Sequence, residues 1–378
     1  MKPLYIYFLA ASLACTSCSD SWLDLNPSTS VPTDQAFSSL EDAQSALNGI
    51  YRLASAHSYY GDNFFYFGDC RAADVQARMT KGDGRRVSPY YEYNVKATDS
   101  FNSSLPWNQV YKVIRQTNNL IAATESGLIK TTDEAALNEI KAQALAMRGL
   151  ALYDLIRVFA MPYSYDNGQS LGVPIVTTAT DQSSKPARNT VAECYDQIIT
   201  DLTNSLAGLS KEKKDGCLNY WAVQGILSRV YLNKLDYPNA YKAATDVIEN
   251  SKSLYQLYTL DEYPTVWGKE YTSESLFEFY FSLTEPSGGS GGEGAPMVYA
   301  NEEKVDWNNL ILSEDYLNLL NEDPQDVRHC VTEVSAIANN EGLPERRRDK
   351  KVYLRSSPAR PAIRATTTCA SCVCQRFI

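Results

Sequence analysis

Residues 221–249 contain two apolar periodicities separated by a break, and this pattern constrains the fold more than any other part of the chain. Before the break, apolar side chains recur every three or four residues, at Val223, Ile226, Leu227, Val230 and Tyr231. After Asp236-Tyr237-Pro238 the same spacing returns, at Ala240, Ala243, Ala244, Val247 and Ile248. Such spacing places one apolar stripe on each of two helices. The stretch therefore predicts a helical hairpin.

Small residues in the second half predict close packing of the two helices. Three alanines let the second helix approach the first, so the pair buries a seam and leaves its outer faces for neighbouring helices. The tetratricopeptide unit is built in this way, and its positions are filled here by Leu227, Ser228, Tyr231, Asp236, Tyr237, Ala240 and Ala244. An ordinary amphipathic hairpin has the same apolar spacing, so both interpretations stay open from this stretch alone.

Further segments with helical periodicity predict a stack around the hairpin. A first pattern opens at Thr33-Asp34, and the later helices are expected at 107–124, 135–159, 190–207, 220–234 and 238–250. Stacked hairpins form a superhelical scaffold whose long loops usually carry the binding residues. We therefore expect a mainly α fold, a tetratricopeptide-like superhelix with long loops and a small irregular or β insert. Within the insert, residues 275–281 predict a strand or buried run, and residues 313–317 a short helix.

The N-terminal residues predict export. Lys2 is followed by an apolar run over residues 4–14, which is too short to span a bilayer permanently, and then by Cys15-Thr16-Ser17-Cys18. A small-residue stretch that ends in cysteine resembles a bacterial lipobox, in which the mature chain begins at the cysteine and its thiol carries the lipid. Because polar residues follow it at once, Cys18 is the expected lipid attachment site, with residues 1–17 as signal peptide. Attachment at Cys15 and a secretory signal without lipid are the alternatives.

Charge and metal-ligand content argue against two kinds of site. The chain carries 35 basic and 45 acidic residues, a net charge of −10, which does not suit neutralisation of a phosphate backbone. We therefore expect no nucleic-acid partner. Cys369, Cys372 and Cys374 cluster, but the chain has only two histidines, His57 and His329, and neither is close in sequence. A zinc site needs about four well-placed ligands, so no metal and no other cofactor is expected.

Several motifs resemble the SusD/RagB family of outer-membrane nutrient-binding lipoproteins. The run from Cys18 to Leu53, CSDSWLDLNPSTSVPTDQAFSSLEDAQSALNGIYRL, resembles the family's opening of lipid-bearing cysteine, tether and helix. The family element W-x-x-x-Y-x-x-I-x-x-x-N-x-x-I is filled at every position from Trp107 to Ile121. The strongest similarity is Arg148, Tyr153, Arg157 and Phe159 followed by Leu171-Gly172-Val173-Pro174. The resemblance implies a SusD-like domain over residues 18–354.

The same resemblance implies a function. Family members capture oligosaccharides and deliver them to a SusC-like TonB-dependent transporter, so we expect a glycan-binding lipoprotein, anchored in the outer membrane by its lipid and exposed at the cell surface. Such a protein is not an enzyme. The alternatives are a RagB-like peptide-binding lipoprotein, a glycoside hydrolase and a tetratricopeptide adaptor. By position in the family, the expected ligand-binding residues are Asp69, Arg71, Asp74, Tyr90, Tyr91, Tyr93, Asn94, Trp267, Tyr299 and Trp307.

The chemistry of the segment 57–98 fits a sugar ligand, although its sequence has no helical pattern. A sugar ring presents C–H bonds on one face and hydroxyls around its rim, so it requires a flat aromatic with donors and acceptors at the edge. Tyrosines and carboxylates alternate through this segment. For the run Phe64–Phe67 we expect core packing instead. Arg148 and Arg157 are expected to pair with acids of adjacent helices.

Residues 355–378 differ in kind from the rest of the chain. From Lys350 onward there is no Asp or Glu, while arginines and three cysteines accumulate. Codons for residues 366–378 can be chosen so that the frame one base earlier reads YNNVRVLRLSEVY, which resembles the family's C-terminal helix. The same shift converts Ser356-Ser357-Pro358-Ala359 into KFPG, also a family-like string. We therefore expect a frameshift near Leu354, an out-of-frame tail over 355–378 and the loss of the family's closing helices; a genuine short variant is the alternative.

Overall fold

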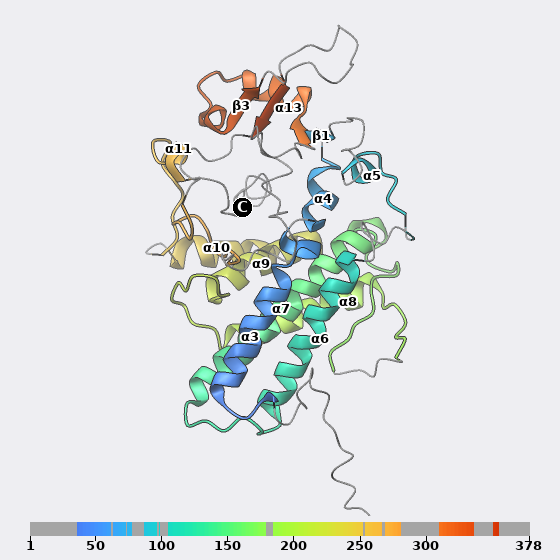
Figure 1. The fold of residues 1–378 in the computed structure, drawn as a ribbon, viewed down its shortest axis with the longest axis vertical. Coiled ribbons are helices and arrows are strands. Elements are labelled where there is room, and N and C mark those ends of the chain that lie inside the picture. The colour runs from blue at the N-terminus through green and yellow to red at the C-terminus, as the bar shows by residue number, and fades with distance from the viewer. Residues whose placement is uncertain are drawn as a thin grey trace, which may run out of the picture.

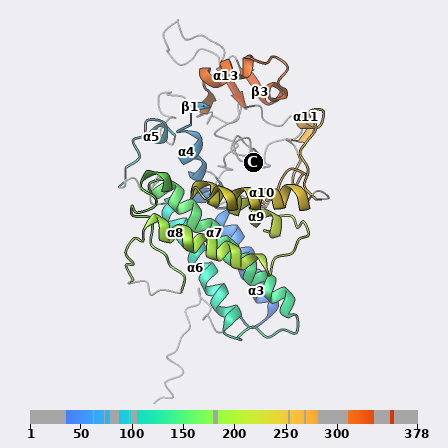
Figure 2. The same ribbon diagram turned by 180° about the vertical axis from the view of Figure 1, so that it is seen from behind.

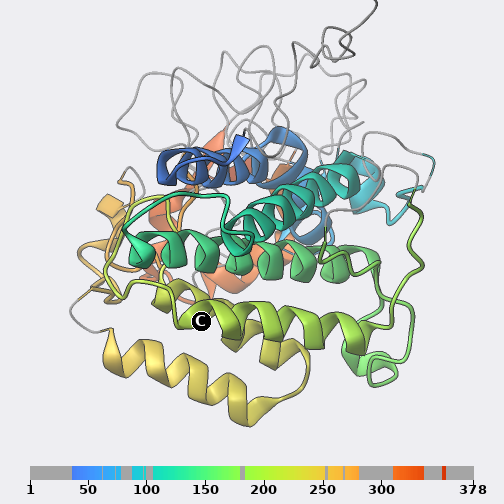
Figure 3. The same cartoon turned by 90° about the horizontal axis from the view of Figure 1, so that it is seen from below.

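Six long helices lie side by side and form the body of the molecule (Figure 1). The computed structural model describes residues 36–61, 63–72, 74–77, 87–96, 98, 105–178, 184–251, 254–266, 269–280, 310–335 and 351–354. The long helices are α3 (Leu40–Ala54), α6 (Leu105–Glu125), α7 (Glu134–Phe159), α8 (Val191–Leu206), α9 (Tyr220–Asn233) and α10 (Tyr237–Asn250). Seen from below, they follow one another in chain order from blue α3 to yellow α10 (Figure 3). The expected helical stack is confirmed.

Capping side chains fix where these helices begin. Thr190 accepts a hydrogen bond from the backbone of Glu193 while Glu193 accepts from that of Thr190, a reciprocal capping box that starts α8. Ser39 and Asp42 form the same arrangement at α3, and Ser39 itself is extended. The helix that carries Leu47 and Ile50 therefore begins at Leu40, later than the pattern that opens at Thr33. An extended Ser39 interrupts any helical run from that point.

The hairpin of α9 and α10 buries the predicted seam with one exception. Val223, Leu227 and Val230 are buried on α9, Ala240 and Ala243 are buried on α10, and the two helices pack together. Ile248 was expected on the same stripe but is 65% exposed. The prediction for Ile248 was wrong because, at about 100° per residue, its side chain lies at the edge of the stripe formed by Ala240, Ala243 and the half-buried Val247. Tyr237 and Tyr241 also face solvent.

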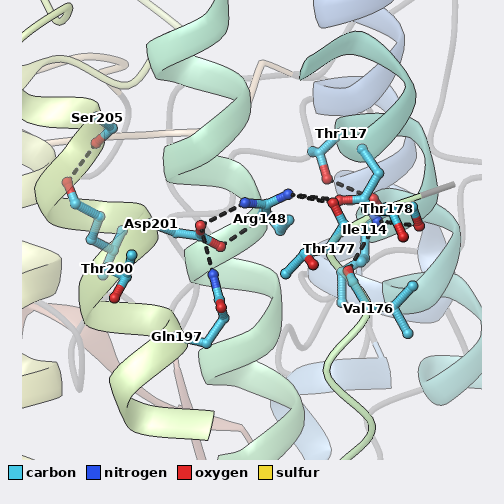
Figure 4. Close-up of polar contacts among 12 residues, drawn as sticks. Ile114, Thr117, Arg148, Val176, Thr177, Thr178, Gln197, Thr200, Asp201 and Ser205 are labelled. Atoms are coloured by element: carbon cyan, nitrogen blue, oxygen red, sulfur yellow. Dashed lines mark hydrogen bonds and ion pairs between the residues drawn. The ribbon is translucent and has the colours of Figure 1, made fainter. Parts of the chain in front are cut away.

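A buried ion pair connects α7 to α8 (Figure 4). Arg148 donates from Nε to Asp201 Oδ2 at 2.8 Å and from Nη2 to Asp201 Oδ1 at 2.6 Å. Its third nitrogen, Nη1, donates to Asn118 Oδ1 on α6 at 2.9 Å. Gln197 completes the set with a 3.0 Å hydrogen bond to Asp201. The expectation that Arg148 pairs with an acid of an adjacent helix is confirmed, and the pair ties three consecutive helices together.

Two family-like motifs that are separate in the sequence meet in space beside this pair. Asn118 donates from Nδ2 to the carbonyl oxygen of Val176 at 2.9 Å (Figure 4). Tyr111, about two turns earlier on α6, donates to the carbonyl oxygen of Pro174 at 2.8 Å. Thus the Trp107–Ile121 motif uses its polar side chains to fasten the loop that follows Leu171-Gly172-Val173-Pro174.

Shorter elements lie above the helical body, on the side of α4 and α10 (Figure 2). The short helices are η2 (His57–Gly61), α4 (Asn63–Asp69), α5 (Ser88–Tyr91), α11 (Tyr263–Val266), α13 (Glu314–Asn321) and η5 (Val327–Val331), with η4 (Tyr163–Tyr165) between α7 and α8. The strands are β1 (Val75–Ala77), β2 (Leu310–Leu312), β3 (Thr332–Ser335) and β4 (Lys351–Leu354). β1 pairs antiparallel with β2, and β3 with β4. This is the expected small insert.

The insert differs from the sequence predictions in two places. The segment 57–98 contains η2, α4 and α5, although its sequence lacks helical periodicity, because helices of four to seven residues are too short to repeat a pattern. Residues 275–280 belong to no strand; Phe279 is buried and Phe277 packs against the core, so the buried-run reading holds for this stretch. The predicted short helix at 313–317 is confirmed as α13, capped by Ser313. The expected signal peptide over residues 1–17 and the expected out-of-frame tail over 355–378 lie outside the described residues.

Candidate ligand-binding face

Buried aromatic rings support the face on which most of the expected binding residues lie. Phe64, Phe65, Tyr66 and Phe67 of α4 are all buried, which confirms the core-packing prediction for this run. Tyr60 adds to the cluster, with its ring centroid 5.5 Å from that of Phe64 and 4.7 Å from that of Phe279. Close, tilted ring pairs of this kind stabilise a core beyond the area that they bury. This buried aromatic cluster therefore forms a rigid base for the residues that follow α4.

One buried carboxylate holds this base to the helical body. Asp154 of α7 is fully buried, and its Oδ2 accepts hydrogen bonds from the hydroxyls of Tyr59 and Tyr60, each at 2.6 Å. Its Oδ1 accepts from Arg157 Nη2 at 2.7 Å. Burial, and then the negative charge of Asp154, raises the pKa of both phenols well above 10, so both remain protonated donors.

Arg157 therefore has a partner other than the one predicted for it. The expected acid on an adjacent helix is replaced by Asp154, three residues earlier on α7. The guanidinium of Arg157 lies 5.7 Å from the ring centroid of Phe64 and 4.8 Å from that of Tyr153. A cation over an aromatic face gains further stabilisation when it is partly desolvated. Arg157 thus helps to hold α4 against α7.

Arg71 and Tyr93 form the most defined part of the face. The Tyr93 hydroxyl donates to the carbonyl oxygen of Arg71 at 2.7 Å, and the Arg71 guanidinium lies 5.8 Å from the Tyr93 ring centroid. Tyr93 is 70% exposed and has a φ of 55°, in the left-handed region that side chains with a Cβ rarely adopt. Strained backbone of this kind persists where surrounding contacts impose it and is concentrated at functional sites. The ring of Tyr93 is therefore exposed to solvent, next to the positively charged guanidinium of Arg71.

The neighbouring residues divide between this surface and the core. Tyr91 is 38% exposed and Asn94 is exposed, so both extend the surface around Tyr93. Tyr90 is fully buried, with its ring centroid 5.4 Å from that of Tyr66 and 4.8 Å from that of Phe67. Since neither face of its ring reaches solvent, the structure places Tyr90 in the core and not on the ligand side. We call Arg71, Tyr91, Tyr93 and Asn94 the Arg71–Tyr93 patch.

The other predicted binding residues do not belong to the Arg71–Tyr93 patch. Asp74 is exposed directly before β1, and its carbonyl oxygen accepts a 2.9 Å hydrogen bond from the backbone of Ser313. Asp69 is half-buried at the end of α4. Both carboxylates border the Arg71–Tyr93 patch in sequence. Trp267, Tyr299, Trp307 and Cys18, the expected lipid attachment site, lie outside the described residues.

The polar node at Asp154 was missed by sequence reasoning. Its donors, Tyr59 and Tyr60, lie 95 and 94 residues away along the chain. A carboxylate on the inward stripe of a long apolar helix is the one signal that could have pointed to it, because a buried charge requires partners. The partners themselves could not have been found in this way.

Two further properties bear on what the face can bind. In the ranges that the structure describes, no group of three or more His, Cys, Asp and Glu residues is arranged to hold a metal ion. No helix within those ranges is long and apolar enough to cross a membrane.

Comparison with known proteins identifies the family. Residues 21–232 match the family model SusD-like_3, described as starch-binding and associating with the outer membrane. A SusD-like protein of Bacteroides ovatus is 26% identical over 262 residues, which is 66% of this chain and 45% of the relative. SusD-like protein P2 of Formosa agariphila is 30% identical over 256 residues, which is 66% of this chain and 47% of the relative. The matched region thus spans about half the length of these curated relatives.

Solved structures give the same result for the fold. A SusD superfamily protein from Bacteroides thetaiotaomicron superposes with a TM-score of 0.79 at 66% identity, covering 84% of this chain and 69% of that one. A laminarin-binding SusD-like protein superposes with a TM-score of 0.65 at 19% identity, covering 79% of this chain and 67% of that one, a likeness of fold alone. The helical stack, the small insert and the match over residues 21–232 lead to one conclusion: this chain belongs to the SusD-like family.

Proposed function

We propose that this protein binds oligosaccharides at the Arg71–Tyr93 patch and passes them to a SusC-like TonB-dependent transporter without chemical conversion. The observation that carries the proposal is the 70% exposed Tyr93, which is held in a left-handed conformation with its hydroxyl bonded to Arg71. A flat, rigid aromatic face accepts the C–H side of a sugar ring at little entropic cost. Arg71 and Asn94 supply donors and acceptors for the hydroxyls at the rim of the ring.

The family description and one structural relative support a glycan as the ligand. The family model is described as starch-binding, and the structural relative with a TM-score of 0.65 is described as laminarin-binding. Both descriptions concern polymers of neutral sugars. In this proposal the protein is anchored at the outer membrane through a lipid on Cys18, on the outer surface of the cell, and the transporter takes the ligand from it.

Binding to glycans in a native gel tests the proposal. The full chain, carrying Cys18→Ser so that no lipid is attached, is run through gels that contain starch, laminarin or polygalacturonate. Retardation by a neutral glycan, without release of reducing ends over hours, is the expected result. Release of reducing ends would instead favour the glycoside hydrolase. Binding of casein-derived peptides with no retardation by any glycan would favour the RagB-like alternative, and binding of neither would favour the tetratricopeptide adaptor.

A further inference from the structure

A second group of tyrosines lies where the loop between α8 and α9 meets the segment that follows α11. Gly216 of that loop has a φ of 73° and no side chain. A Cβ placed on Gly216 would lie 3.4 Å from the Cβ of Tyr280 and 3.8 Å from the hydroxyl oxygen of Tyr271. The two tyrosines therefore approach one point of the loop, although they lie 55 and 64 residues beyond it in the chain.

Tyr280 is fixed in place by its neighbours and still exposed. Phe279 is buried, and Phe277 and Phe279 pack with ring centroids 4.8 Å apart and contact the ring of Tyr51 at 6.1 and 6.5 Å. Tyr280 directly follows this anchor in the chain. Its side chain is 65% exposed. An aromatic ring presented by a well-packed segment loses little freedom when a ligand stacks on it.

Tyr271 is held in an unfavourable backbone conformation. Its φ is 51°, again in the left-handed region, and its N–H donates to Glu278 Oε2 at 3.1 Å. The next residue, Thr272, accepts a 2.6 Å hydrogen bond at its carbonyl oxygen from Lys213 Nζ. Contacts from two different segments thus impose this conformation, as is common at binding sites.

Several polar groups at this place are available to a ligand. The Asp215 carboxylate is exposed, and no hydrogen bond to it or to the hydroxyls of Tyr271 and Tyr280 occurs within the described ranges. Glu270, Glu278 and Asp215 all lie close enough to act on the Tyr271 phenol, with Lys213 as the cation beside Glu278 and Asp215. The local charge is therefore negative, which disfavours an anionic ligand.

We propose that Lys213, Asp215, Tyr271 and Tyr280, gathered over Gly216, form a second carbohydrate-contact surface that selects neutral, hydroxyl-rich sugars over acidic ones. This Tyr271–Tyr280 patch rests on the proposed glycan-binding function and adds a contact that is separate in sequence from the Arg71–Tyr93 patch. The two phenol rings supply stacking area, while Asp215 and the phenol hydroxyls bond the rim hydroxyls of the sugar. Its acidic residues repel uronate and sulfate groups.

Affinity electrophoresis of matched variants tests this surface. The full chain with Cys18→Ser is compared with Tyr280→Ala, Tyr271→Phe and Tyr93→Ala in gels containing starch, laminarin or polygalacturonate. Tyr241→Ala is the control, since Tyr241 is a 75% exposed tyrosine on α10. Tyr280→Ala is expected to weaken binding of the neutral glycan roughly 2- to 12-fold, as loss of one aromatic contact does. Tyr271→Phe, which keeps the ring, is expected to weaken it about 2- to 10-fold through one lost hydrogen bond. Tyr241→Ala should leave retardation unchanged.

The outcomes separate this inference from the function on which it rests. Retardation reduced by Tyr93→Ala but by neither Tyr280→Ala nor Tyr271→Phe would overturn the second surface and leave glycan binding in place. Tighter binding of polygalacturonate than of starch and laminarin would overturn the predicted selectivity. If the parent protein is retarded by none of the three glycans, the proposed function and this inference both fail. Thermal melting of each variant shows whether it is folded, and Tyr271→Phe still tests the surface if Tyr280→Ala is not.

Discussion

The hydroxyl of Tyr60 donates a 2.6 Å hydrogen bond to the carboxylate of Asp154, which lies 94 residues further along the chain. The ring of the same tyrosine packs 4.7 Å from that of Phe279. One side chain therefore joins η2, the long helix α7 and the segment that carries Tyr280. Both proposed binding surfaces depend on this connection. Tyr60 contacts Phe64 of α4, the helix that precedes Arg71, and it contacts Phe279, which precedes Tyr280.

Replacing Asp154 should destabilise the protein strongly. Asp154→Asn leaves Arg157 without its anionic partner and gives two tyrosine hydroxyls a poorer acceptor. We expect the free energy of unfolding to fall by about 3 kcal/mol, the lower end for a broken buried pair, since Arg157 is 28% exposed. Urea denaturation measures the change. Tyr60→Phe is the control and should cost about 1.5 kcal/mol, because Tyr59 still donates to Asp154. An Asn variant that unfolds at the parent midpoint would contradict this role.

The ion pair between Arg148 and Asp201 should be far more important than the one at the surface. Arg148→Lys cannot reproduce the two bonds to Asp201 and the bond to Asn118, so it should cost about 2 to 4 kcal/mol. Lys234→Ala removes the surface pair with Asp196, whose carboxylate side chain is 69% exposed, and should cost about 0.5 kcal/mol. Chemical denaturation of both variants in one buffer gives the comparison. If both variants lost the same free energy of unfolding, burial would not determine how much the pair of Arg148 and Asp201 stabilises the protein.

Two glycines in helices should respond oppositely to alanine. A Cβ at Gly149 of α7 would lie 2.9 Å from Cγ of Leu202, a fully buried residue of α8. Gly149→Ala should therefore destabilise by about 1 to 3 kcal/mol through overpacking. At Gly49 of α3 nothing lies within 4 Å, so Gly49→Ala should stabilise by up to about 1 kcal/mol through helix propensity. The two melting temperatures should move in opposite directions. A stabilised Gly149→Ala variant would contradict this prediction and would mean that the Leu202 side chain can move away from the added methyl group.

Tyr93 should contribute to binding without a net contribution to stability. Tyr93→Gly removes the ring but relieves a left-handed backbone that costs a non-glycine residue about 1 kcal/mol. This gain roughly offsets the lost hydrogen bond to Arg71, also about 1 kcal/mol. We expect unchanged stability and glycan affinity weakened by about 0.5 to 1.5 kcal/mol. Tyr93→Phe keeps the ring and should bind nearly as the parent. Titration calorimetry with the glycan that retards the parent, combined with thermal melts, measures both quantities.

Asp326 should make stability depend on pH in the acid range. Hydrogen bonds from the Arg328 side chain lower the pKa of Asp326 from 3.8 to about 2. A carboxyl with a depressed pKa in the folded state stabilises above its unfolded pKa, and this stability is lost as the pH falls from 4 towards 2. Because Arg328 is 41% exposed, solvent screening limits the effect to about 1 kcal/mol. Asp326→Asn should therefore lower the free energy of unfolding at pH 6 and about half as much at pH 3. A difference that grows at pH 3 would refute the assignment.

The helical scaffold was predictable from the sequence because its determinants are local. The helix expected over residues 135–159 is observed as Glu134–Phe159, and the one expected over 190–207 as Val191–Leu206. Apolar spacing and capping residues are contained within each of these segments. Ile248 shows the limit of this reasoning, since its spacing matches the stripe but its position at the edge of the stripe leaves the side chain exposed.

The candidate site was predictable only in its location. Tyr90 and Tyr91 are adjacent and chemically identical, yet the first is fully buried and the second is 38% exposed. The rotation of the four-residue helix α5 about its axis determines which of the two is buried. A helix this short contains no repeated apolar spacing from which that rotation could be predicted. Likewise Asp154 receives its hydrogen bonds from donors about 95 residues away, and Gly216 meets tyrosines from another segment. Such long-range pairings follow from the tertiary fold and not from local pattern.

The side-by-side order of the long helices affects how the chain acquires its structure. Each long helix packs on its neighbour in sequence, and in addition α3 contacts α7 and α7 contacts α9 (Figure 3). The stability of such an array comes mainly from the interfaces between successive helices. Any adjacent pair of helices can therefore act as the starting point for folding. During synthesis, α6 can dock on α3 and α7 on α6 before α10 has left the ribosome. Assembly of the body can therefore keep pace with translation, and the insert, whose β1 and β2 are more than 230 residues apart, is completed last.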